Sequence, residues 1–99
     1  MTDTFRTVSP ADIQLRGDID HVGLLTEELC NAIERASGPI SIDLAAVTFL
    51  DASGLAMLSA VHEYAHTLGR TIRWHGVHGM PARVLSITGL VHRLNVGPS

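Results

Sequence analysis

The stretch Ile40–Leu68, ISIDLAAVTFLDASGLAMLSAVHEYAHTL, changes its hydrophobic period from two to about 3.6. Residues 40–44 alternate apolar and polar side chains, which is typical of a strand with one buried face. The second half repeats apolar residues at intervals of three and four, as a helix does, at Leu55, Leu58, Val61, Ala65 and Leu68. The change of period predicts that a buried strand passes into a helix at or near residues 51–54.

Two residues at this junction are suited to the start of a helix. Asp51 and Ser53 both carry side-chain oxygens that can accept hydrogen bonds from the N–H groups of a first helical turn. The N-terminus of a helix also carries partial positive charge, which attracts anions. We therefore expect the hydroxyl of Ser53 to lie in a local field that favours a negatively charged group.

Length and composition limit the class of protein. A chain of 99 residues has room for one domain, and its 45% hydrophobic and 17% charged residues predict a folded globule. The net charge of −3 and the scattered arginines give no reason to expect direct binding of nucleic acid. Cys30 has no second cysteine to pair with, residues 1–14 contain no apolar h-region, and nowhere do about 18 apolar residues run together. We expect a cytoplasmic protein without membrane insertion.

The N-terminal half predicts an edge hairpin and a helix before the central strand. Residues 5–8 and 13–15 alternate on either side of a turn with Pro and Asp, which favours a hairpin. Residues 22–36 place apolar side chains on one helical face, and Gly38-Pro39 ends that helix. Because long connections lie on both sides of residues 40–44, that strand is expected to be central, with parallel neighbours.

The C-terminal part predicts a further strand and helix. The helix that begins near Ser53 is expected to end at Gly69, and residues 71–75 alternate as a strand. A glycine-bearing loop then reaches Pro81, a good first residue for a short helix. That helix is expected to place Val84, Leu85 and Thr88 on its inward face. One or two further helical turns are expected over residues 90–94, and a short strand at Val96. The order of elements predicts an α/β fold.

Three segments occur in the order and spacing of a known family: GDID at 17–20, IDLAAVTFLDASGLAML at 42–58 and ARVLSITGLVHRLNV at 82–96. The chain resembles the STAS family, the domain shared by sulfate transporters and bacterial anti-sigma-factor antagonists. The resemblance extends over nearly all of residues 1–99. It implies a single domain with a mixed, mostly parallel β-sheet and helices largely on one face. It also implies a binding module with no catalytic residues and no cofactor.

The resemblance assigns roles to particular residues. Ser53 matches the serine that a partner kinase phosphorylates, Asp51 matches the acidic residue before it, and Asp20 matches an acidic residue on the neighbouring loop. Ala52 departs from the family, because many antagonists have a second serine there. The expected partner-binding face, with Ala56 and Met57 exposed beside Ala60, comprises Asp20, Asp51, Ala52, Ser53, Gly54, Ala56 and Met57.

The function implied by the resemblance is that of an anti-sigma-factor antagonist. Such a protein binds an anti-sigma factor of the serine-kinase type and thereby regulates transcription by partner switching. Phosphorylation of Ser53 would release the partner, and a PP2C-type phosphatase would restore binding. The alternative is a STAS scaffold or subunit of a stressosome or a lipid-transport ABC complex, which docks through the same face without a phospho-switch. Nucleotide binding, linked to some STAS members, stays open.

Two enzymatic motifs compete with this interpretation. His62-Glu63-Tyr64-Ala65-His66 fits H-E-x-x-H, in which two histidines on one helical face bind zinc and the glutamate acts as a base. We expect this spacing to be a coincidence and the motif not to be a metal site, because the histidines flank the apolar stripe of a helix that the small core needs. Adventitious zinc binding at the surface is the remaining alternative. Ser-His-Asp hydrolysis is not expected either, because Ser53 lacks the G-x-S-x-G context.

Overall fold

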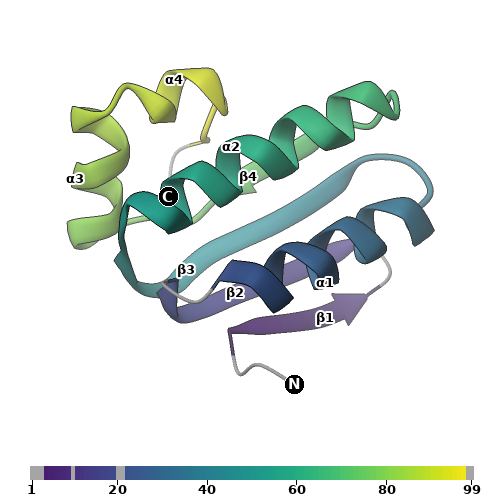
Figure 1. Ribbon diagram of the computed structural model, residues 1–99, viewed down its shortest axis with the longest axis horizontal. Helices are drawn as coiled ribbons and strands as arrows, with labels where there is room; N and C mark the ends of the chain where they lie inside the picture. Colours follow the sequence, from purple (N-terminus) through teal and green to yellow (C-terminus); the bar gives the residue numbers. More distant parts are fainter. Residues whose placement is uncertain (1–3, 10, 20–21, 98–99) are drawn as a thin grey trace.

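The computed structural model describes residues 4–9, 11–19 and 22–97. Within these ranges one sheet has the order β1-β2-β3-β4, with β1 antiparallel to β2 and both other pairs parallel (Figure 1). The strands are β1 (Phe5–Ser9), β2 (Asp12–Ile19), β3 (Ile40–Leu50) and β4 (Ile72–His75). The expected hairpin and the central position of β3 are both confirmed.

The two long helices cover one face of the sheet. Figure 1 shows α1 and α2 side by side on one face of the sheet, roughly along the direction of the strands, and α3 packs against β3 and α4. The helices are α1 (Val22–Arg35), α2 (Ala52–Thr67), α3 (Gly79–Ile87) and α4 (Leu90–Arg93). This arrangement confirms the mixed, mostly parallel sheet with helices largely on one face. Across the described ranges, every helix is too short or too polar to cross a membrane.

The core lies between the sheet and the helices. Alternate residues of β2 turn Ile13, Leu15 and Ile19 toward the helices. Of the predicted apolar face of residues 22–36, Leu25, Leu29 and Ile33 on α1 and Ala36 just after it are buried, and Val22 is partly buried. The hydroxyl of Tyr64 on α2 donates a hydrogen bond to the carboxylate of Glu34 on α1, which joins the two helices at their outer side.

Strand β3 is longer than the alternation of residues 40–44 predicts. Its register with β2 shifts twice, each time by one additional residue in β3. Such bulges place two consecutive residues on the outer face, so the buried residues become three apart at Leu44, Val47 and Leu50. The period-two signal is therefore lost after Leu44, although the strand continues to the residue before Asp51.

The C-terminal segment differs from prediction in one helix start, one side chain and one expected strand. α3 begins at Gly79, two residues before Pro81. Thr88 is exposed, because its hydroxyl donates to the carbonyl of Val84 at 2.9 Å and satisfies the end of α3 instead of entering the core. Val96 belongs to no strand: its N–H donates to the carbonyl of Val91 at 3.0 Å, which closes the turn after α4.

Candidate functional site

The junction between β3 and α2 has the geometry of a capped helix start. Asp51 is extended, with φ −103° and ψ −173°, and its Oδ1 accepts a hydrogen bond of 2.9 Å from the N–H of Gly54. The N–H of Leu55 donates to the Asp51 carbonyl at 2.9 Å, the first bond of the helix. The expected passage from strand to helix at this point is confirmed, with Asp51 as the N-cap.

Ser53 lies on the first turn of α2 with its side chain exposed. Its hydroxyl donates a hydrogen bond of 2.6 Å to Oδ1 of Asp51, the same oxygen that caps Gly54. The hydrogen bond from Ser53, followed by that from the Gly54 N–H, lowers the pKa of the Asp51 carboxyl below its usual range. The site therefore combines an exposed hydroxyl, an ionised carboxylate and the N-terminus of a 16-residue helix.

Gly54 is required by the close packing of α2 on the end of β2. A Cβ at this position would lie 2.5 Å from the carbonyl oxygen of Ile19 and 2.9 Å from Cδ1 of Leu50. Ile19 and Leu50 are themselves partners in the parallel pairing of β2 with β3. The end of β2 is thus fixed against the first turn of α2. Asp20, the next residue in sequence and a predicted member of the site, lies outside the described residues.

The predicted partner-binding residues divide into exposed and buried groups. Around the hydroxyl, the exposed side chains of α2 are Ala52, Ser53, Ala56 and Ala60. Met57 is only 3% exposed, so its predicted exposure is wrong: it lies three residues after Gly54 and four before Val61, on the side of the helix that faces the core. Gly54 is buried too, so it shapes the junction without presenting a surface.

Residues not singled out from the sequence extend the exposed surface toward β2. The hydroxyl of Thr48 donates to Oδ1 of Asp18 at 3.2 Å, and Phe49, the β3 partner of Asp18, is 38% exposed. Thr48 and Phe49 lie two residues and one residue before Leu50, and Asp18 lies one residue before Ile19, the β2 partner of Leu50. The bulge that exposes both Thr48 and Phe49 gives no signal in a pattern of alternating residues.

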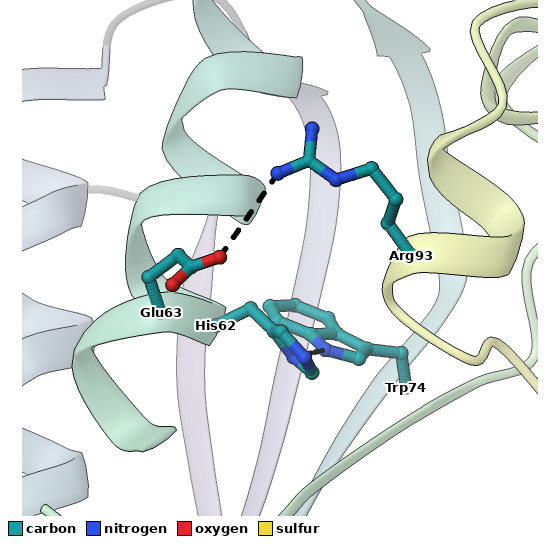
Figure 2. A network of polar contacts seen from close by, with 4 residues as sticks. All are labelled: His62, Glu63, Trp74 and Arg93. Carbon is teal, nitrogen blue, oxygen red and sulfur yellow. Dashed lines mark hydrogen bonds and ion pairs between the residues drawn. The ribbon is translucent and has the colours of Figure 1, made fainter. Parts of the chain in front are cut away.

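The H-E-x-x-H motif has structural partners. Nδ1 of His62 accepts a hydrogen bond of 3.1 Å from Nε1–H of Trp74, a fully buried indole (Figure 2). Glu63 points elsewhere and pairs with Arg93 at 4.0 Å, while His66 is exposed. In residues 4–9, 11–19 and 22–97, no three His, Cys, Asp or Glu side chains are grouped to hold a metal ion. His62 therefore satisfies the polar atom of a core tryptophan.

Two comparisons with known proteins match this fold. The family model described as "Mlab, STAS domain" matches residues 4–96. A solved structure of the anti-sigma factor antagonist SpoIIAA in its unphosphorylated form superimposes with a TM-score of 0.75 over 96% of this chain and 85% of that chain. Because the two sequences are only 18% identical, this structural likeness shows a shared fold alone. Because the family model spans nearly the whole sequence, the chain belongs to the STAS family.

Proposed function

We propose that this protein is an anti-sigma-factor antagonist that binds a serine-kinase-type anti-sigma factor through the surface around Ser53. The observation that carries the proposal is the exposed Ser53 hydroxyl, held at 2.6 Å from the capping carboxylate of Asp51. Membership of the STAS family and a fold shared with SpoIIAA, itself an anti-sigma factor antagonist, support this class of partner. The complex would form in the cytoplasm and free a sigma factor.

The surface around the hydroxyl suits close approach by another protein. The side chains of Ala52, Ala56 and Ala60 are exposed and small, so a partner's backbone can come near the helix. Phe49 adds an exposed apolar ring at the end of β3. Aromatic residues are enriched at the centres of protein interfaces, where they contribute large contact area. The proposed contact surface is therefore Phe49, Ala52, Ser53, Ala56 and Ala60, with the Asp51 carboxylate beside them.

Phosphorylation of Ser53 changes this surface without opposing the fold. A phosphoryl group replaces the hydroxyl proton, so the hydrogen bond to Asp51 is lost, and a charge of about −1.5 to −2 is added beside an ionised carboxylate. The helix N-terminus still attracts the phosphate. A partner that buries the neutral hydroxyl would have to desolvate a charged phosphate instead. If this reduces the binding free energy by about 2.8 kcal/mol, the affinity for the partner falls roughly a hundredfold. A PP2C-type phosphatase would reverse the change.

A second candidate is a docking subunit of a larger assembly such as a lipid-transport ABC complex, because membership of the STAS family is compatible with that role as well. The same surface would then bind constitutively. Affinity capture with the tagged full chain, followed by identification of bound proteins by mass spectrometry, separates the two. We expect a kinase-type anti-sigma factor, retained by Ser53→Ala and lost with Ser53→Asp. Recovery of an ABC ATPase without such a kinase, equally by both variants, would support the second candidate.

A further inference from the structure

A groove runs between the edge strand β1 and helix α1, away from the Ser53 surface. It encloses a cavity of about 350 Å³, lined by Phe5 and Thr7 from β1 and by Glu28, Asn31, Ala32 and Arg35 from α1. Within the described residues β1 is the last strand on this side of the sheet, and α1 runs beside it in the same direction (Figure 1). The groove therefore has one wall of strand and one wall of helix.

The backbone of β1 offers hydrogen-bonding groups to this groove. The N–H of Arg16 donates to the carbonyl of Thr4 at 3.0 Å, and this bond establishes the phase of the antiparallel ladder, that is, which residues of β1 direct their backbone groups toward β2. In that phase Arg6 turns its N–H and C=O toward β2, and Phe5 and Thr7 turn theirs away from β2. The same two residues supply the side chains that line the groove. Backbone groups and cavity are thus presented together.

We propose that this groove binds an extended peptide segment of a partner protein, added antiparallel to β1 as a further strand. The peptide would exchange N–H and C=O hydrogen bonds with Phe5 and Thr7, and every second side chain would enter the groove. Main-chain bonds would provide affinity, and the cavity would select the side chains. The proposal does not depend on the function proposed for Ser53.

The lining of the groove specifies the peptide. Phe5 and Ala32 are the partly buried apolar residues of its lining, so a peptide side chain that packs against them should be apolar. Glu28 and Arg35 stand seven residues apart on α1, about 10 Å along the helix. Alternate residues of a strand are about 7 Å apart, so three of them span both charges. The matching segment carries an acidic, an apolar and a basic residue at alternate positions, in that order.

Nuclear magnetic resonance with three synthetic heptapeptides tests the proposal on the full chain. The first carries Glu, Val and Lys at its second, fourth and sixth positions and Ser elsewhere. The second is N-methylated at the Val, whose N–H would face β1; the third is N-methylated at the next residue, whose N–H would face away. We expect amide shifts confined to β1 and α1, and at least tenfold weaker binding of the second peptide than of the other two.

Charge reversal tests the direction of the peptide. Arg35→Glu should weaken binding several-fold, and a peptide with Lys in place of its Glu should restore it. Arg6→Glu is the matched control, because Arg6 alternates with Phe5 and Thr7 and lies on the other face of the sheet. Ser53→Asp should leave peptide binding unchanged.

Three results would overturn the proposal. One is the absence of amide shifts in β1 and α1 at about 1 mM peptide, a concentration at which binding with a millimolar dissociation constant would still be detected. A second is equal affinity for the two N-methylated peptides, which would remove the backbone pairing. A third is concentration-dependent dimerisation through β1 with no response to peptide, which would assign this edge to a second copy of the chain.

Discussion

Ser53 and Asp51 are joined by a hydrogen bond of 2.6 Å, from the serine hydroxyl to the carboxylate oxygen that also caps the same helix. The Ser53 hydroxyl and the N–H of Gly54 therefore donate to the same acceptor atom, Oδ1 of Asp51. Phosphorylation would remove the hydroxyl donor and place a second negative group beside that oxygen. We predict that the amide resonance of Gly54 shifts on phosphorylation while the resonances of β1 do not. An unchanged Gly54 resonance in the phosphorylated protein would contradict this coupling.

The lowered pKa of Asp51 predicts a pH dependence of stability. Because the pKa is lower in the folded than in the unfolded state, the ionised carboxylate stabilises the fold above the usual aspartate pKa of about 3.9. That contribution is lost as the pH falls through the folded-state pKa. Asp51→Asn keeps a capping oxygen but does not titrate. Urea unfolding should show the parent losing stability relative to Asp51→Asn below about pH 4. A difference that stays constant from neutral pH to about pH 2 would contradict it.

Gly54→Ala should destabilise the protein even though alanine favours helices. The added Cβ would overlap the Ile19 carbonyl, and such overpacking typically costs about 1–3 kcal/mol. Gly23→Ala in α1 is the matched control, since its Cβ would meet no atom within 4 Å. It should leave stability unchanged or raise it by up to about 1 kcal/mol. Denaturant unfolding of both variants measures the contrast; equal effects would show that the approach of α2 to β2 does not constrain Gly54.

His62→Ala should destabilise the fold and His66→Ala should not. Removing His62 leaves Nε1–H of the buried Trp74 without its acceptor, which costs about 1–3 kcal/mol. His66 is exposed, so its change should stay within about 0.5 kcal/mol. Neither substitution should alter partner binding. A stoichiometric zinc ion held by both histidines and a third side chain in protein purified without added metal would overturn this account of the motif.

Ser53→Ala should keep the fold with little loss. Because Asp51 supplies the N-cap bond to Gly54, the substitution removes a side-chain hydrogen bond but not the cap. We expect a cost of about 1 kcal/mol or less, and Ser53→Asp should be folded as well as the parent. Thermal melts of the three proteins measure this. A loss well above about 2 kcal/mol for Ser53→Ala would show that the serine is itself the principal cap.

The features predictable from the sequence are those set by neighbouring residues. The passage from β3 to α2 was predictable because the change of period and the capping residue Asp51 lie within a few residues of each other. The bulges in β3 were not, because they arise from its pairing with β2, which is remote in sequence.

The orientation of α2 was harder to predict, because apolar residues occur on most of its sides. Leu68, in the apparent apolar stripe, is 43% exposed, whereas Met57, which the pattern leaves outside that stripe, is buried. Packing on the sheet selects the buried face, so the predicted exposure is confirmed at Ala56 and Ala60 and is wrong at Met57. The Trp74–His62 bond likewise joins α2 to β4 and leaves no local signal.

The central claim is that Ser53 is a phosphorylation switch, and one experiment addresses it most directly. The parent, Ser53→Ala and Ser53→Asp are each titrated calorimetrically into the kinase-type anti-sigma factor, and the parent is mapped by mass spectrometry after incubation with that partner and ATP. The account predicts phosphate on Ser53, parent-like affinity for Ser53→Ala, and affinity at least about tenfold weaker for Ser53→Asp. Phosphate on Thr48 or Ser59 with Ser53 unmodified, or equal affinity of the parent and Ser53→Asp, would contradict it.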